Sequence, residues 1–546
     1  MQSSFGIKSI TILIVFIIFD PNNELDIMKK LVLIALGMAM ACNSSQKTVP
    51  EKTVVSQPSA GPLSFAKTIT MAELEEHLYE YASDKYEGRE TGEPGQKMAS
   101  EYIKNEYISL GIPAAKSDGN YYQNVPLEAK KMPAGTISLN GTEYKLGEDV
   151  LSFSAAEGSF DNVIYAGYGI DDKNYSDYKD LDVEGKLVLV KFGEPKNQDG
   201  TYKVTGTNKS SNWSNISDAF GRRSKAVMDN GGIGMIYEDA ANFGRYKSYF
   251  NRMKKSPTGS LSVKAGKEDF INILFNEKTA SALFPDIFES DESKSVTTDL
   301  KLNITTDNNS ISSENVVAFV KGSTKPYEYV VISAHLDHIG KTSKGEINNG
   351  ADDDGSGTVA LLEIAEAFKN AAEAGQRPKR SIVFLHVTGE EKGLLGSQYY
   401  TDHNPIFPLA QTVANLNIDM IGRIDPEREG GRNYVYLIGS DKLSTELHVL
   451  SEEVNRKYAN IELDYKYNDE NDPNRFYYRS DHYNFAKNNI PIIFYFNGTH
   501  DDYHRPSDTP DKINYDLLEN RARLIFHTAW EIANRDQKVV VDKATK

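Results

Sequence analysis

Short apolar runs alternate with longer amphipathic segments over the second half of the chain. Runs rich in β-branched and aromatic residues predict buried strands at 329–334, 381–387, 413–418, 434–438 and 490–496. Apolar residues at helical spacing predict helices at 358–368, 444–457 and 515–534. Strands that alternate with helices are typical of an open sheet covered on both faces. We therefore expect an α/β domain built on a doubly wound mixed sheet.

Two further helices are predicted upstream of these elements. Leu74 and Leu78 share one face of a helix at 72–82, and the same spacing continues over 96–110 until Gly111 stops the second helix. Both helices are expected to belong to the α/β domain.

The pattern changes between about residues 145 and 303, where short strands and glycine turns prevail. The segments NVIYAGYGI, GKLVLVKFG and RRSKAVMDNGGIGMIYED carry no metal-binding or acid–base chemistry. A chain of 546 residues also exceeds one ordinary core, so two folded domains are expected. We predict a smaller β-rich domain at 141–305, inserted between residues 69–140 and 306–537 of the α/β domain, with a tail at 538–546.

The N-terminus reads as a targeting segment at 1–42 followed by a polar tether at 43–68. Its apolar runs are shorter than the roughly 20 residues that a membrane span needs. The second run lies between two lysines and Cys42, which is the order of a basic region, an apolar region and a cleavage site. A chain that started at Met28 would still contain this whole signal, so Met28 is a candidate for the true start.

Candidate metal-binding residues follow the predicted strands or a glycine-rich turn. They occur in the order His335, Asp353, Glu390, Glu391, Asp419 and His504. In an open α/β sheet, ligands bind outside the carboxyl ends of the strands. Imidazole and carboxylate donors suit Zn²⁺, and a carboxylate can bridge two ions. Two ions could activate one water for hydrolysis.

Adjacent side chains in the Glu390–Glu391 pair diverge, so one can bind metal while the other faces the water. We assign Glu391 to the metal and Glu390 to the role of general base. In the segment GADDDGSG, three neighbouring acids would repel one another unless a cation were present. Each of these motifs is weak alone, and their joint occurrence in one order carries the prediction.

These segments resemble the M28 family of zinc metallopeptidases, which includes bacterial aminopeptidases with two co-catalytic zinc ions. The resemblance implies a zinc exopeptidase fold in which His335 and Asp419 hold one zinc, Glu391 and His504 hold the other, and Asp353 bridges both. It also implies Glu390 as the base. Asp337 would orient His335, and Tyr503 would stabilise the oxyanion.

Other histidines are interpreted more simply. His386 lies in an apolar run and is expected to be a hydrogen-bonded core residue, whereas His338 and His500 are expected in loops near the site. The segment RSDHYNF recurs in bacterial relatives, which suggests that Asp481 and His482 line the substrate side of the pocket.

Two further resemblances concern the remaining parts of the chain. The inserted domain is similar to the protease-associated (PA) domain found in this family, which implies a lid or a substrate-selecting role. The N-terminus resembles a bacterial lipoprotein signal with Cys42 as the lipidated residue. This implies attachment to a membrane of the bacterial cell envelope, with secretion as the alternative.

Composition excludes one class of partner. A net charge of −17 without a basic stripe argues against nucleic acid. The single cysteine forbids an internal disulfide and says nothing about redox compartment. Taken with the metal-binding motifs, the resemblance to the M28 family implies a two-zinc aminopeptidase acting on peptides. The alternatives are a carboxypeptidase or dipeptidase of the same family, a glutaminyl cyclase, and a non-catalytic binding lipoprotein.

Overall fold

The structure is a computed structural model that describes residues 61–255, 260–264 and 270–543. The predicted targeting segment with Met28 and Cys42 lies outside the described residues, as does the tether up to residue 60. No helix within the described ranges is long and apolar enough to cross a membrane.

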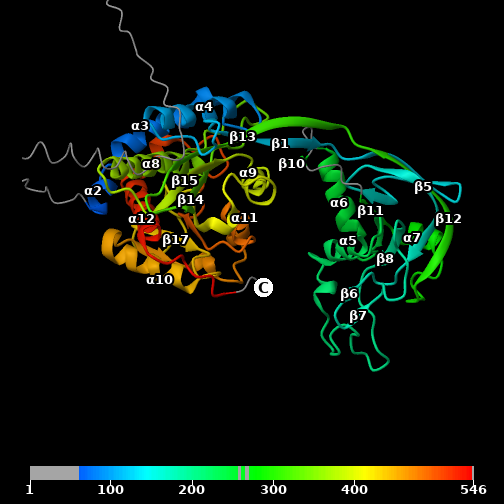
Figure 1. The fold of residues 1–546 in the computed structure, drawn as a ribbon. Coiled ribbons are helices and arrows are strands. Elements are labelled where there is room, and N and C mark those ends of the chain that lie inside the picture. The colour runs from blue at the N-terminus through cyan, green and yellow to red at the C-terminus, as the bar shows by residue number, and fades with distance from the viewer. Residues whose placement is uncertain (1–60, 256–259, 265–269, 544–546) are drawn as a thin grey trace, which may run out of the picture. The chain divides into compact units, whose positions relative to one another are not determined.

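The first of two large sheets has nine strands in the order β10-β1-β13-β15-β14-β16-β19-β17-β18. Figure 1 labels six of them, β1, β10, β13, β14, β15 and β17. Its centre is parallel and comprises β15 (Arg380–Val387), β14 (Lys325–His335), β16 (Thr412–Ile418) and β19 (Ile492–Phe496). The edges are β13 (Asn308–Val320), β1 (Tyr122–Lys130) and β10 (Ser260–Val263) on one side, and β17 (Tyr434–Ile438) and β18 (Glu462–Asp464) on the other. All residues of β15 and β16 are buried, as in a sheet covered on both faces.

Helices pack on both faces of this sheet. One face shares a core with α2 (Pro62–Ala66), α3 (Met71–Tyr81), α4 (Pro94–Ser109), α8 (Gly357–Glu373), α10 (Thr445–Val454) and α12 (Tyr515–Asn534). The other face packs against α11 (His482–Ala486) and the π-helical turn η4 (Tyr399–His403). The predicted α/β class with a mixed sheet is therefore confirmed.

The predicted elements are all present, but several begin or end at other residues. β14 begins at Lys325 rather than 329, and α8 extends to Glu373 rather than 368. The tether predicted at 43–68 is wrong at its end, because residues 62–66 form α2 and bury Phe65 and Ala66. The helix predicted to Lys457 ends at Val454 and continues as the π-helical turn η6 (Asn455–Ala459). The Asn455 side chain donates to the carbonyl of Ile461 and accepts from its amide, which turns the chain towards β18.

The second sheet has eight strands in the order β3-β2-β12-β5-β8-β9-β11-β4. They are β2 (Ala134–Leu139), β3 (Thr142–Lys145), β4 (Val150–Ser152), β5 (Ala156–Tyr165), β8 (Leu187–Lys191), β9 (Gly234–Glu238), β11 (Ile271–Phe275) and β12 (Lys294–Thr305). One core on this sheet includes α7 (Glu277–Leu283), and another includes α5 (Ala219–Asp229) and α6 (Phe243–Lys254).

The chain enters and leaves the second sheet at adjacent positions. Lys130 at the end of β1 pairs with Asn308 at the start of β13, and the second sheet is formed by residues between them. Its first strand begins at Ala134, ahead of the predicted boundary at 141. The strand β10 comes from the same stretch but pairs with β1 in the first sheet. The likeness of the inserted domain to a PA domain stays a prediction.

Candidate metal centre

The predicted metal-binding residues meet at the carboxyl ends of parallel strands. His335 is the last residue of β14, the Glu390–Glu391 pair follows β15, and Asp419 follows β16. Because neighbouring parallel strands end at the same edge of a sheet, these side chains converge. Asp353 joins them from the turn that precedes α8, and His504 joins from the loop that follows β19.

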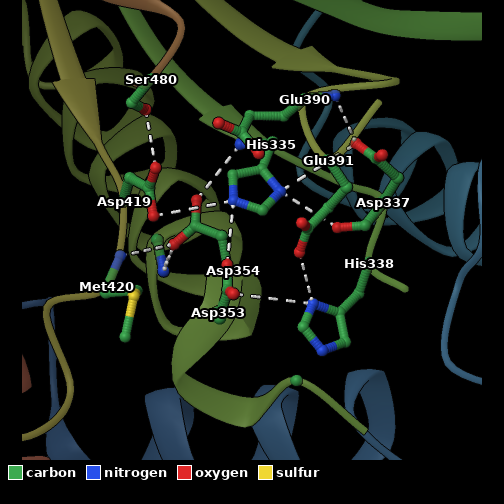
Figure 2. Close-up of polar contacts among 12 residues, drawn as sticks. His335, Asp337, His338, Asp353, Asp354, Glu390, Glu391, Asp419, Met420 and Ser480 are labelled. Atoms are coloured by element: carbon green, nitrogen blue, oxygen red, sulfur yellow. Dashed lines mark hydrogen bonds and ion pairs between the residues drawn. The ribbon is translucent and has the colours of Figure 1, made fainter. Parts of the chain in front are cut away.

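The donors form two groups that share Asp353. In the first group, Nε2 of His335 lies 3.2 Å from Oδ1 of Asp353 and 3.6 Å from Oδ1 of Asp419 (Figure 2). In the second, Nε2 of His504 lies 3.1 Å from Oδ2 of Asp353 and 3.1 Å from Oε2 of Glu391. Asp353 therefore presents one carboxylate oxygen to each group.

The electrostatics of these groups favour bound positive charge. Burial lowers the pKa of the His504 imidazole, but its contacts with Asp353 and Glu391 outweigh burial and raise that pKa to about 10. Burial opposes ionisation of Asp353, yet His335 and His504 hold its pKa well below the usual range. Nε2 of His335 and Oδ2 of Asp353 are buried without a hydrogen-bond partner among the described residues. Among the described residues, one cluster that could hold a cation is His335, Asp353 and Asp419, and the other is His338, Asp353 and Glu391. Imidazole and carboxylate donors of this kind bind divalent cations.

Asp337 supports this centre differently from the predicted way. Nδ1 of His335 lies 3.0 Å from the main-chain carbonyl oxygen of Asp337 and 4.0 Å from its carboxylate. The carboxylate instead accepts hydrogen bonds from the Thr91 hydroxyl at 2.7 Å and the Glu390 amide at 3.2 Å. Asp337 therefore orients His335 through its backbone and positions the Glu390 loop through its side chain.

Only one of the three consecutive aspartates faces the donors. The Asp354 carboxylate accepts from the amides of His335 and Met420, each at 3.1 Å (Figure 2). The Asp352 carboxylate accepts from the amide of Gly422 at 2.7 Å. Backbone N–H groups therefore bind the outer two carboxylates, although burial and the charges of Asp419 and Asp353 still raise the pKa of Asp354 well above its usual value.

Two residues that contact the donors were missed in the sequence. Nδ1 of His338, expected to be a loop residue near the site, lies 2.8 Å from Oε1 of Glu391 and is fully buried. Ser480 donates to Oδ2 of Asp419 at 2.6 Å. The only indication of their role in the sequence is their proximity to candidate site residues. His338 follows Asp337, and Ser480 precedes the Asp481–His482 pair.

A small cavity opens beside the donors. Its walls are Asp353, Glu390, Asp419, Met420, Phe476, Arg479, Phe494, Phe496, Thr499 and Tyr503. Burial raises the pKa of Glu390 well above its usual value, and the neighbouring carboxylates of Asp419 and Glu391 add to this shift. Burial likewise raises the pKa of Tyr503, so its phenol stays protonated and can donate a hydrogen bond. The Tyr503 ring stacks on His504 with centroids 3.9 Å apart.

The tentative substrate residues Asp481 and His482 are not among the residues that line this cavity. His482 is fully buried, contacts the carbonyl of Tyr477 at 2.8 Å and stacks on Phe494. Asp481 is also fully buried and accepts from the Ser397 hydroxyl. His482 therefore packs against the cavity wall at Phe494, whereas the Asp481 carboxylate binds Ser397, which is not a wall residue.

His386 is the buried core residue that the sequence predicts. Its Nε2 lies 2.7 Å from the hydroxyl of Tyr107, and burial lowers its pKa to about 3.

Comparison with known proteins shows which family the domain with the metal centre resembles. Residues 315–529 match the profile of peptidase family M28, and this range includes every predicted metal-binding residue. This part of the chain matches the M28 peptidase family. The family resemblance stated from the motifs is thus confirmed.

Individual relatives share the domain at moderate identity. "Probable glutamate carboxypeptidase LAMP1" of Arabidopsis thaliana is 33% identical over 106 residues, which are 19% of this chain and 14% of that protein. "Aminopeptidase YwaD" of Bacillus subtilis (strain 168) is 33% identical over 112 residues, 20% of this chain and 22% of that protein. The chain therefore spans less than a quarter of each of these relatives.

One solved structure is similar over a longer range. An aminopeptidase from Aneurinibacillus sp. strain AM-1 aligns with 89% of this chain and 99% of its own, at 18% identity and a TM-score of 0.44.

Proposed function

We propose that this protein is a zinc-dependent aminopeptidase that hydrolyses N-terminal residues from peptides. The observation that carries the proposal is the sharing of Asp353 between two donor groups, each completed by one histidine and one further carboxylate. His335 and Asp419 would hold one ion, and Glu391 and His504 the other. When bound, the two ions supply Lewis acidity that polarises the substrate carbonyl and lowers the pKa of water.

The residues at the cavity perform the proton transfers of hydrolysis. The Glu390 carboxylate accepts a proton from the attacking water as its oxygen bonds to the carbonyl carbon. Glu390 then delivers this proton to the nitrogen of the leaving amine as the C–N bond breaks. Tyr503 donates its phenolic hydrogen bond to the carbonyl oxygen, where negative charge develops. Bound cations would lower the raised pKa of Glu390 and so make its carboxylate available as a base.

The cavity walls support a substrate with an apolar side chain at the cleaved position. Met420, Phe476, Phe494 and Phe496 form an apolar surface beside the donors. The names of the relatives include both aminopeptidase and carboxypeptidase.

A carboxypeptidase or dipeptidase is the second candidate because Arg479 also lines the cavity. A guanidinium can bind a terminal carboxylate in a bidentate manner.

Two measurements on the purified full-length protein test the proposal. Metal analysis should give two zinc ions per chain. A panel of peptides with free, amino-blocked and carboxyl-blocked ends should be cleaved only where the amino group is free. Cleavage that requires a free carboxylate would instead support the carboxypeptidase, and a chain that binds zinc but cleaves no peptide would contradict both.

A further inference from the structure

We propose that Asp508 is a positioning residue that holds the turn of Asp353 so that this carboxylate can serve both donor groups. The inference rests on the proposed function. Asp508 is fully buried in the loop that also carries His504. Its Oδ2 accepts from the amide of Asp352 at 3.0 Å and from the amide of Asp353 at 3.2 Å. Its main-chain carbonyl accepts from the amide of Ala351 at 3.2 Å.

These contacts join two metal-binding segments that are distant in sequence. Three successive amides of the turn before α8 donate to one residue of the loop after β19. Burial of a carboxylate is unfavourable unless hydrogen bonds or a charged partner offset its lost hydration. The amides of Asp352 and Asp353 therefore stabilise the buried carboxylate of Asp508. The same hydrogen bonds fix the backbone of the turn.

The charge partners of Asp508 do not account for its position. Nη1 of Arg423 lies 3.8 Å from Oδ1 of Asp508, which is too long for a hydrogen bond. The same guanidinium makes a closer contact, at 3.0 Å, with Asp502. Oδ1 of Asp508 has no hydrogen-bond partner among the described residues. The short contacts of this carboxylate are thus directed to the turn of Asp353.

The position of Asp353 determines what loss of this contact does. The next residue, Asp354, is fixed through its own carboxylate to the amides of His335 and Met420. Asp508 fixes the N-terminal side of the turn, so Asp353 is held between two anchors. Because Asp353 contacts both donor groups, release of one anchor weakens both groups together, whereas loss of an ordinary ligand weakens one.

The test compares Asp508→Leu and Asp508→Asn with the wild-type holoenzyme by zinc titration against a competing chelator. Leucine has a similar size but accepts no hydrogen bond, and we expect the affinity for both ions to fall together by about 10–100-fold, as for other supports of metal ligands. Asparagine retains one neutral acceptor, and charge-assisted bonds are roughly twice as strong as neutral ones. We therefore expect partial rescue, with both affinities lowered by about fivefold.

A matched control separates positioning from general loss of a buried carboxylate. Asp177 in the second sheet's domain is also buried and accepts from the amide of Ile170 at 2.9 Å and the hydroxyl of Tyr175 at 2.6 Å. Asp177→Leu should lower the melting temperature without changing zinc affinity.

Several outcomes would overturn the inference. Wild-type affinity for both ions in Asp508→Leu would do so, and so would loss of one ion only. If Asp508→Leu does not fold, unchanged affinities in Asp508→Asn would decide against it. A wild-type chain that binds no zinc would overturn the proposed function as well, whereas a two-zinc wild type with unaffected variants would overturn this inference alone.

Discussion

Glu390 and Glu391 are adjacent in the chain but have different surroundings. The Glu391 carboxylate contacts His338 at 2.8 Å and His504 at 3.1 Å, so its oxygens are directed to imidazoles. The Glu390 carboxylate lines the cavity, and its backbone amide is held by Asp337. These surroundings support the hypothesis that Glu391 binds metal and Glu390 acts as the base.

Replacement of the base should separate chemistry from metal binding. We expect Glu390→Gln to keep its fold and zinc content but to lower kcat by at least about 10²–10⁴-fold, because an amide cannot accept the proton of water. Peptide hydrolysis and metal analysis on the same preparation measure both quantities. More than a tenth of wild-type turnover in the variant would exclude this role for Glu390.

The shared carboxylate should behave differently from a ligand of one group. Asp353→Asn should weaken both ions, because a neutral amide offers no charged oxygen to either group, whereas Glu391→Gln should weaken mainly one. Zinc stoichiometry after dialysis distinguishes the two variants. Equal stoichiometry in both variants and the wild type would rule out a bridging role for Asp353.

The motif residues were predictable from sequence, and their supporting contacts were not. His335, the Glu390–Glu391 pair and Asp419 each follow an apolar run, so their places at strand ends could be inferred from the sequence. Whether His338 or Ser480 touches a donor depends on side-chain directions within the folded loops. For the same reason, the sequence could not show that Asp352 and Asp354 accept hydrogen bonds from backbone amides.

At the scale of elements, the start of α8 depends on the absence of a side chain. A Cβ at Gly357 would lie 2.3 Å and 2.5 Å from the two carboxylate oxygens of Asp354. That carboxylate joins the ends of β14 and β16 through the amides of His335 and Met420. Close approach of the helix to the two strands therefore requires glycine here.

Gly357→Ala should displace the Asp354 carboxylate and weaken both the fold and the metal centre. We expect a loss of about 1–3 kcal/mol in unfolding free energy, as for other overpacked sites, together with lower zinc affinity. Urea denaturation and zinc titration provide the measurements. Gly221→Ala in α5 is the control, because no atom lies within 4 Å of its new Cβ, and it should gain about 0.5–1 kcal/mol. Equal stability of the two variants would contradict the steric account.

At the scale of the whole molecule, strand alternation predicted the centre of the first sheet but not its edge. Buried parallel strands such as β15 and β16 are continuous apolar runs, which local sequence reveals. The pairing of β10 with β1 places Val263 opposite Leu127, although most of the inserted stretch separates the two residues in sequence. Pairing between residues so distant in sequence leaves no local pattern. The sequence therefore places β10 in the inserted domain at 141–305, although it pairs in the first sheet.

Attachment of the whole chain to a membrane is a proposal that rests on the sequence around Cys42, which lies outside the described residues. If Cys42 carries acyl chains, burial of their methylenes contributes about 0.8 kcal/mol each, and more than one chain is needed for a stable anchor. In a host that processes lipoproteins, the wild type should partition into the detergent phase. Cys42→Ser should remain in the aqueous phase or keep its signal, with peptidase activity and zinc content unchanged because the metal centre does not involve this residue. A wild type in the aqueous phase, or a variant in detergent with its signal removed, would favour simple secretion.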